Sequence, residues 1–252
     1  MDDIEARVLT NEHIIKDYFL LRLRLSIPMG RIMPGQFVML KIPGGSVFLR
    51  RPFSVWDYKR GIISIMYKVK GRGTQDLTRA TGGDRTYVLG PLGRGFSIKE
   101  NGEHVVVAGG IGIAGVRMLL EKLRSNVCLF YGCTDEKEAL LTEGLSISDI
   151  SISTIDGSLG FKGNVTDMLR DYMKKQKKQD IQVYACGPEG MIKSLRDVLE
   201  RFRTPCQVLL EERMACGLGL CFGCVKKTLD QKEPYKRVCK EGPVFNIWQI
   251  CL

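Results

Sequence analysis

Hydrophobic and polar positions follow two different patterns along this chain. From about residue 7 to 98, apolar and polar residues alternate in short runs, such as 37–42 and 62–67, with turn residues between them. A period of two is typical of half-buried strands, and several short strands at this spacing predict a small antiparallel β-barrel. Within this stretch, only residues 74–81 suggest a helix.

Beyond residue 101 the pattern changes to strands that alternate with helices. We expect strands at 105–108, 127–131, 150–155, 181–185 and 206–210, and helices at 113–124, 165–173 and 189–202. The first helix has one apolar face, and Asn164 and Pro188 suit the starts of the second and third helices. This alternation predicts a parallel α/β sheet that is covered by helices on both faces.

Residues 211–252 are rich in Cys and Gly and too few to form a core of their own. With 252 residues, 44% of them hydrophobic, the chain is long enough for two domains and a small appendage. We therefore expect a β-barrel domain over 1–99, an α/β nucleotide-binding domain over 100–210 and a small C-terminal segment over 211–252.

The chain is basic, with 38 Lys and Arg against 28 Asp and Glu, a formal charge of +10. Such a balance is compatible with nucleic acid, an acidic partner or phosphate-rich cofactors, but the basic residues are scattered. The one dense run, 174–178, is typical of a solvent-exposed helix end. No apolar run approaches ~18 residues and the N-terminus is acidic, so we expect no membrane span and a cytoplasmic location.

Four of the nine cysteines cluster near the C-terminus, in the pattern Cys216-x4-Cys221-x2-Cys224-x14-Cys239. An odd number of cysteines in such a chain argues against a disulfide framework and for metal or redox chemistry. The spacing is that of plant-type [2Fe–2S] clusters. Structural zinc is the alternative, but zinc sites favour two paired knuckles and Cys239 stands alone. We predict a [2Fe–2S] cluster.

A glycine-rich turn, Gly110-x-Gly112-x-x-Gly115, follows the strand at 105–108 and opens a helix. This context suits a dinucleotide, whose pyrophosphate would approach the helix N-terminus. Asp135 and Glu136 lie about 20 residues further on, where an acid can meet a ribose 2′-hydroxyl. A second loop, residues 185–191, follows another strand at the edge where open α/β sheets bind ligands.

Polar residues in the predicted barrel suit a phosphate-bearing cofactor. Arg51 could pair with a pyrophosphate, Ser54 could offer a hydroxyl to a flavin ring, and Gly73 with Thr74 could bind phosphate. On chemistry alone, ordinary β-turns are the simpler explanation of the same residues.

The order of these three parts resembles the ferredoxin–NADP reductase superfamily. Within it, the chain is similar from about residue 5 to the end to the electron-transfer subunits of class 1B, NAD-dependent dihydroorotate dehydrogenase. The resemblance implies three cofactors, namely FAD, a [2Fe–2S] cluster and NAD as electron acceptor. It implies an FAD site of Arg51, Pro52, Phe53, Ser54, Met66, Tyr67, Lys68, Gly73 and Thr74. It implies that Gly110, Gly112, Cys186, Gly187 and Pro188 face the nicotinamide nucleotide, and that Cys216, Cys221, Cys224 and Cys239 ligate the cluster.

The resemblance also implies an oxidoreductase subunit of pyrimidine biosynthesis. It would pass electrons from an FMN-containing dihydroorotate dehydrogenase catalytic subunit through [2Fe–2S] and FAD to NAD⁺, in a heterotetramer of two plus two chains. No residue here suggests a base for dihydroorotate, and the histidines are His13 and His104 alone. We therefore expect no catalytic residue for that step in this chain.

One departure from the family pattern is Ala114-Gly115, where a proline is usual. The lack of a basic residue in 133–136 favours NAD over NADP. Three alternatives stay open. The first is an NAD(P)H-linked reductase subunit of another complex, of the sulfite reductase or sulfide dehydrogenase type. The others are a non-enzymatic zinc and nucleic-acid-binding module and a structural scaffold with a relict cluster.

Overall fold

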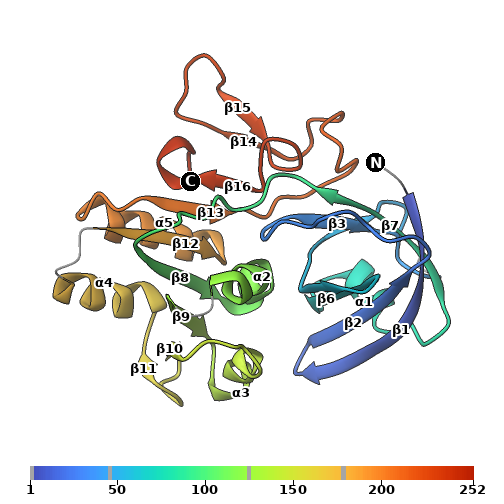
Figure 1. Cartoon of the computed structure of the whole chain (residues 1–252), viewed down its shortest axis with the longest axis horizontal. Helices are drawn as coiled ribbons and strands as arrows, with labels where there is room; N and C mark the ends of the chain where they lie inside the picture. The colour runs from blue at the N-terminus through green and yellow to red at the C-terminus, as the bar shows by residue number, and fades with distance from the viewer. Residues whose placement is uncertain (1–2, 45–46, 124–125, 177–179) are drawn as a thin grey trace.

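Two seven-stranded sheets carry the fold, one antiparallel and one largely parallel, with a small two-stranded sheet beside them (Figure 1). The computed structural model describes residues 3–44, 47–123, 126–176 and 180–252. In Figure 1 the antiparallel sheet lies on the right, the parallel-rich sheet on the left, and the C-terminal segment along the top.

The antiparallel sheet has the strand order β4-β3-β7-β1-β2-β6-β5. Because β4 at one edge also contacts β6 near the other edge, the sheet curls on itself, and the predicted barrel is confirmed. Its interior is filled by alternate side chains, such as Leu21, Leu23 and Leu25. The short helix α1 spans Arg72–Leu77. The strands are β1 (Asp3–Ile15), β2 (Tyr18–Leu25), β3 (Phe37–Leu40), β4 (Arg51–Ser54), β5 (Asp57–Lys59), β6 (Ile62–Lys68) and β7 (Arg85–Leu92).

The second sheet has the order β11-β10-β9-β8-β12-β13-β16 and is parallel except for its last pair. Its strands and helices agree closely with those predicted from periodicity; α3 and β11 were missed because they are too short to show a period. The strands are β8 (Glu103–Gly109), β9 (Val127–Cys133), β10 (Asp149–Thr154), β11 (Phe161–Lys162), β12 (Ile181–Cys186) and β13 (Cys206–Leu209). The helices are α2 (Ile113–Leu123), α3 (Glu136–Ala139), α4 (Val165–Lys175) and α5 (Glu189–Glu200).

Helices cover both faces of this sheet, as its apolar strands require. On one face α4 and α5 bury Leu169 and Leu195 against Val105 and Val183. On the other, α2 buries Leu119 against alternate strand residues. Asn164 and Pro188 do occupy the N-cap positions of α4 and α5. The Asn164 side chain, however, accepts no backbone N–H.

The C-terminal segment is not a separate body. Its hairpin β14 (Val225–Lys227) and β15 (Tyr235–Arg237) stands apart, but β16 (Val244–Asn246) pairs antiparallel with β13. Val238, Phe245 and Ile247 are buried in the same core as α4 and α5. A segment too short for its own core thus completes that of the α/β sheet.

The barrel packs directly on α2, which faces it in Figure 1. Tyr18 and Met66 of the barrel share one buried cluster with Ile113 and Ala114 of α2. This contact sets the positions of the two pockets described below.

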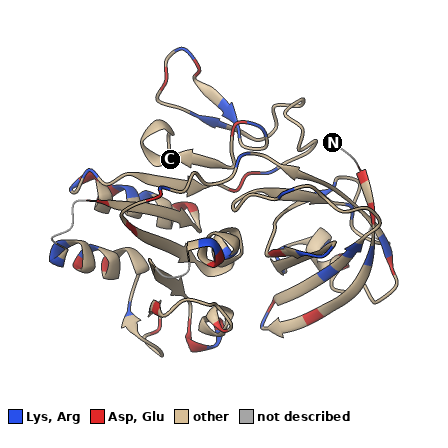
Figure 2. Cartoon of the chain, in the orientation of Figure 1, with Lys and Arg blue, Asp and Glu red and all other residues tan. Residues whose placement is uncertain are grey.

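Charged residues are spread over every part of the fold (Figure 2). Lys174 and Lys175 end α4, as expected for a solvated helix end, while 177 and 178 lie outside the described residues. None of the helices in the described ranges is long and apolar enough to cross a membrane.

Candidate functional site

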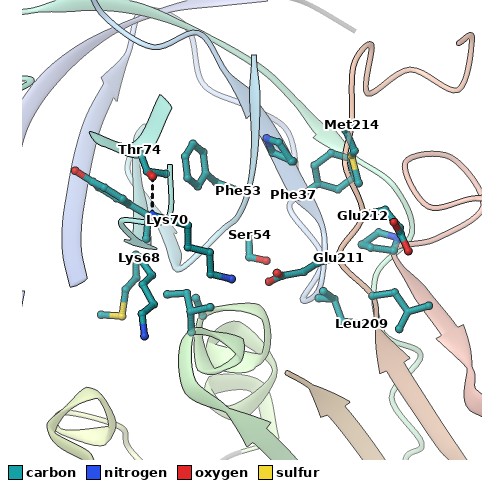
Figure 3. A pocket seen from close by; sticks show the side chains of 17 residues that line it. Phe37, Phe53, Ser54, Lys68, Lys70, Thr74, Leu209, Glu211, Glu212 and Met214 are labelled. Carbon is teal, nitrogen blue, oxygen red and sulfur yellow. Dashed lines mark hydrogen bonds between the residues drawn. The ribbon is translucent and has the colours of Figure 1, made fainter. Parts of the chain in front are cut away.

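A pocket of about 210 Å³ lies where the barrel, the N-terminus of α2 and the C-terminal segment meet (Figure 3). Barrel strands β4 and β6 form one wall, and the chain that leaves β13 forms the other. The lining is mostly apolar, with a few polar groups, which suits a large planar cofactor. Its polar side chains are Ser54, Lys68, Lys70, Thr74, Glu211 and Glu212.

Most of the residues expected to bind FAD line this pocket. They are Pro52, Phe53 and Ser54 from β4, Met66, Tyr67 and Lys68 from β6, and Thr74 from α1. Arg51 and Gly73 do not line it but lie against each other, since a Cβ on Gly73 would approach the Arg51 Nε to 2.8 Å. Glycine at 73 therefore lets the guanidinium pass close to the backbone of α1.

Thr74 and Tyr67 each have hydrogen-bond partners within the barrel domain. The Thr74 hydroxyl accepts the Lys70 N–H at 2.9 Å and the Gly71 N–H at 3.2 Å, so it holds the turn before α1. The Tyr67 hydroxyl donates to Asn11 Oδ1 at 3.1 Å. Burial raises the pKa of Tyr67 to about 12, so the ring presents a neutral face to the pocket.

The sequence did not reveal the opposite wall, which Glu211, Glu212 and Met214 form. Figure 3 shows Lys70 and Glu211 reaching into the pocket from opposite sides. Glu211 follows the carboxyl end of β13, and this position is the one available signal, because ligands of open α/β sheets bind at that edge.

A second, larger pocket of about 580 Å³ lies at the carboxyl ends of β8, β9 and β12. Gly110, Gly112, Gly187 and Pro188 line it, as expected for nucleotide-facing residues. A Cβ on Gly112 would collide with the Cys186 carbonyl, so only glycine fits there. The first three residues of the glycine-rich turn, Gly110–Gly112, form a 3-10 helix directly before α2.

Cys186 itself lies behind the pocket. Its thiol is fully buried, burial raises its pKa well above the usual value, and it packs against Gly115. Glycine at position 115 therefore allows α2 to pack closely on β12. Ala114, its neighbour, instead lines the first pocket.

The two pockets adjoin, because Lys68, Lys70, Ile111 and Glu211 line both. A group in the first pocket and a group in the second would thus lie in neighbouring spaces, with Lys68 and Ile111 between them. This arrangement suits transfer between a flavin and a nicotinamide.

A buried hydrogen-bond network joins the barrel to the nucleotide pocket. The Tyr18 hydroxyl donates to Glu138, and the Lys68 Nζ lies 3.1 Å from the Tyr18 hydroxyl and 3.6 Å from the Glu138 carboxylate. The Thr134 N–H and hydroxyl both donate to Glu138 Oε2 at 2.8 Å. Burial acts to raise the pKa of Glu138, but Tyr18 and Thr134 outweigh it and hold the pKa below its usual value.

The sequence suggested that Asp135 could meet a ribose 2′-hydroxyl, but in the structure its carboxylate already has partners. Its Oδ1 accepts the Glu138 N–H at 3.1 Å and caps α3, and its carboxylate pairs with Lys16. Glu136 is exposed in α3, and its N–H donates to the Ser158 hydroxyl at 2.8 Å.

The four clustered cysteines lie close together as two adjacent thiol pairs, Cys216 with Cys221 and Cys224 with Cys239. Backbone N–H groups of Leu218, Gly223 and Cys239 each donate to one of these sulfurs at 3.4 Å. No three His, Cys, Asp or Glu side chains among the described residues form a ready single-ion cage. Two thiol pairs that accept backbone N–H hydrogen bonds suit the ligands of an iron–sulfur cluster.

Cys216 favours the thiolate form that ligation requires, whereas burial and the neighbouring Cys224 raise the pKa of the Cys239 thiol to about 12. Burial acts to raise the pKa of Cys216, but N–H donors from Leu218 and its neighbours, with Cys221, lower the pKa to about 6. Arg237 braces the loop: it donates to the Gly219 carbonyl at 2.8 Å, and its guanidinium lies 4.8 Å from the centre of the Phe222 ring.

The loop that carries the cysteines presents apolar side chains to solvent. Leu220 is 77% exposed, Phe222 59% and Leu218 39%. Because monomeric proteins seldom expose such a group of large apolar residues together, this loop has the character of a contact surface.

Family models match two parts of the chain. Residues 211–251 match the iron–sulfur cluster binding domain of dihydroorotate dehydrogenase B, and residues 106–197 match an oxidoreductase NAD-binding domain. The first match includes all four cysteines. It favours the iron–sulfur prediction over the zinc alternative.

Solved structures with the same fold include reductases of several kinds. An NADH-dependent reduced ferredoxin–NADP oxidoreductase is 27% identical with a TM-score of 0.87, over 98% of this chain and 89% of that one. A ferredoxin–NADP⁺ reductase from Neisseria gonorrhoeae with bound FAD and NADP is 19% identical, with a TM-score of 0.67, over 79% and 90%. The ferredoxin–NADP reductase fold expected from the sequence is thereby confirmed.

Curated relatives extend over nearly the whole chain. The electron-transfer subunit of dihydroorotate dehydrogenase B (NAD⁺) from Caldanaerobacter subterraneus subsp. tengcongensis is 37% identical over 96% of each chain. The subunit of the same name from Geobacillus thermodenitrificans is 39% identical over 87% of each. This chain belongs to the family of NAD-dependent dihydroorotate dehydrogenase B electron-transfer subunits.

Proposed function

We propose that this chain carries electrons from an FMN-containing, dihydroorotate-oxidising subunit to NAD⁺, by way of a [2Fe–2S] cluster and FAD. It is the NAD-linked half of the enzyme and does not oxidise dihydroorotate by itself. The single observation that carries the proposal is the adjacency of the three sites. The chain leaves β13 through the lining of both pockets at Glu211, reaches Met214 in the first pocket, and arrives two residues later at Cys216.

The chain divides by cofactor in this proposal. Residues 1–99 hold FAD, 100–210 hold NAD, and 211–252 hold the cluster. The FAD residues are Arg51, Pro52, Phe53, Ser54, Met66, Tyr67, Lys68, Gly73 and Thr74. Those for NAD are Gly110, Gly112, Cys186, Gly187 and Pro188, with Cys186 supporting the turn from behind. The cluster ligands are Cys216, Cys221, Cys224 and Cys239.

The flavin, when bound, supplies the exchange between single electrons and a hydride. The residues of this chain hold and orient the reactants. Ile111, in the turn before α2, lines both pockets, and Ala114 of α2 lines the first, so these two side chains would help to position the reactants. The glycine turn leaves room for a pyrophosphate at the helix N-terminus.

The cluster loop is the proposed exit toward the FMN-containing subunit. Leu218, Leu220 and Phe222 surround the cysteines and are exposed. Electron transfer requires a short distance between centres, so the partner would cover this loop. A heterotetramer of two chains of each kind, and a cytoplasmic location, complete the proposal.

A reductase subunit of another complex is the second candidate, favoured by the structural match at a TM-score of 0.87 over nearly the whole chain. Both candidates require flavin and cluster, and they differ in the partner. Native purification followed by mass identification of the co-purifying chain separates them. A dihydroorotate-oxidising partner supports the proposal, and a sulfite-reducing or ferredoxin-linked partner overturns it.

The visible spectrum and dye reduction test the NAD-linked half alone. Purified chain should show flavin bands and cluster absorption, and NADH should reduce an artificial acceptor at a rate proportional to the flavin content. Colourless protein, or protein that contains zinc in place of iron, would exclude both candidates.

A further inference from the structure

The tip of the β1–β2 hairpin reaches from the barrel to the nucleotide pocket. Lys16 occupies the two-residue turn between Ile15 and Tyr18, with φ +48°, a conformation that residues with a Cβ seldom adopt. The His13 ring donates to the Lys16 carbonyl and so fixes the turn. A strained residue held in place in this way is a reason to look for a function of its side chain.

The Lys16 ammonium lies at the end of β9. It pairs with the Asp135 carboxylate and lies 3.3 Å from the Thr134 hydroxyl, and Thr134 lines the nucleotide pocket. Asp135 also occupies the place, about 20 residues past the glycine turn, where an acid meets the ribose 2′-hydroxyl of NAD. Through Thr134, the cation and the carboxylate both lie beside the nucleotide pocket, near the strand end at which such folds recognise a ribose 2′-hydroxyl.

Residues 133–136 contain no base, which on its own favours NAD. The barrel nevertheless supplies a cation to this place from 119 positions away. A negative charge at Asp135 disfavours a 2′-phosphate, whereas an ammonium beside it attracts one.

On the basis of the function proposed above, we infer that Lys16 is a specificity-determining residue of the nucleotide site. Its ammonium can leave Asp135 for a 2′-phosphate, so that the site accepts NADP(H) as well as NAD(H).

Three features make this exchange physically accessible. Lysine is a point charge on a flexible stem, so it can change partner without moving the backbone. The two side chains are 33% and 27% exposed, so Asp135 can turn to water when Lys16 leaves. Asp135 also keeps the Glu138 N–H, so the start of α3 is retained.

The test compares two adenosine fragments that need no flavin. Calorimetry on the purified full chain measures the binding of adenosine 2′,5′-bisphosphate and of 5′-AMP, which differ in the 2′-phosphate. Lys16→Gln should weaken bisphosphate binding roughly tenfold, the effect of one partly exposed charge-assisted bond, and change 5′-AMP binding less than about twofold. Lys16→Arg should retain most of the bisphosphate affinity.

Two further variants serve as controls. Lys137→Gln removes an exposed cation two positions after Asp135 and should leave both affinities unchanged, which excludes a general charge effect. Asp135→Asn removes the competing carboxylate while keeping a capping side chain, and should strengthen bisphosphate binding. The holoprotein should follow the same order in NADPH-dependent against NADH-dependent dye reduction.

The outcomes separate the inference from the proposed function. If Lys16→Gln weakens the binding of both fragments equally, or leaves bisphosphate binding unchanged, then Lys16 only stabilises the contact between the domains and the inference is wrong. In either case 5′-AMP binding and NADH-dependent dye reduction by the unaltered chain would still support the nucleotide site. If the unaltered chain binds neither fragment, the proposed site and the inference both fail.

Discussion

Gly115 of α2 packs directly on Cys186 at the end of β12, and a Cβ at position 115 would lie 2.8 Å from the Cys186 Sγ. The third glycine of the turn therefore sets the distance between the helix and the sheet. The nucleotide pocket begins immediately beside this contact.

Gly115→Ala should destabilise the fold by about 1–3 kcal/mol, the range for an overpacked core. NADH affinity should fall with it, since α2 and its preceding turn must shift. Chemical unfolding and NADH titration measure the two effects. Gly190→Ala, where a Cβ meets nothing within 4 Å, is the matched control for stability and should be neutral or slightly stabilising in chemical unfolding. Equal stability of the two variants would contradict the close contact.

Cys221→Ser should remove or cripple the cluster, because a hydroxyl is a harder and poorer ligand than a thiolate. FAD should remain bound, since its pocket is lined by other residues. Iron and labile sulfide assays with the visible spectrum measure the result. Cys251→Ser, outside the four-cysteine pattern, should leave the cluster intact. Full iron and sulfide content in the Cys221 variant would show that the ligand assignment is wrong.

Arg51→Ala should weaken FAD binding by about 1.5–3 kcal/mol, the range for charge-assisted hydrogen bonds. Arg50 is the control, because it points away and pairs with Asp3 at 2.6 Å on the surface. Fluorescence titration of apoprotein with FAD measures both variants. Similar losses in the two would indicate general basic charge rather than a specific contact.

Leu220→Glu should weaken association with the FMN-containing subunit by placing an unpaired charge in the contact. NADH reduction of the bound flavin should be nearly unchanged. Ile27→Glu, at an exposed apolar residue outside the cluster loop, is the control. Unaltered affinity of the Leu220 variant for its partner would place the electron exit elsewhere.

Glu138 should contribute to stability at neutral pH and lose that contribution in acid. Its pKa in the folded chain lies below the usual 4.5, because Tyr18, Thr134 and Lys68 favour the carboxylate over the opposing effect of burial. The contribution is therefore present above about 4.5 and is lost as the pH falls through the folded pKa. The difference in unfolding free energy between the unaltered chain and Glu138→Gln should accordingly shrink from about pH 6 to about pH 3. A difference independent of pH would contradict the ionised state.

Local patterns predicted much of the fold. The face of Ile113, Val116 and Leu119 predicted α2, and the alternation of short apolar runs predicted the barrel, because both periods arise within one element. The glycine turn was likewise identifiable, since Gly112 is required by a close backbone approach. The cysteine spacing predicted which thiols lie together.

Contacts between distant segments could not be predicted in the same way. Pairing of β16 with β13, the entry of Glu211 into both pockets and the pairing of Lys16 with Asp135 depend on how finished elements pack. No local period encodes such contacts. The last of these contacts changed the interpretation most. Residues 133–136 contain no basic side chain, and Lys16 of the barrel places one beside them.

A coupled assay with the reconstituted complex measures directly whether electrons pass from dihydroorotate through this chain to NAD⁺. This chain, loaded with FAD and cluster, is mixed with an FMN-containing dihydroorotate-oxidising subunit, dihydroorotate and NAD⁺, and NADH formation is followed by absorbance. NADH formation should require both subunits and should be lost with Cys221→Ser. NADH formation by the partner alone, or no NADH from a complex whose flavins and cluster are all present, would contradict this path of electrons.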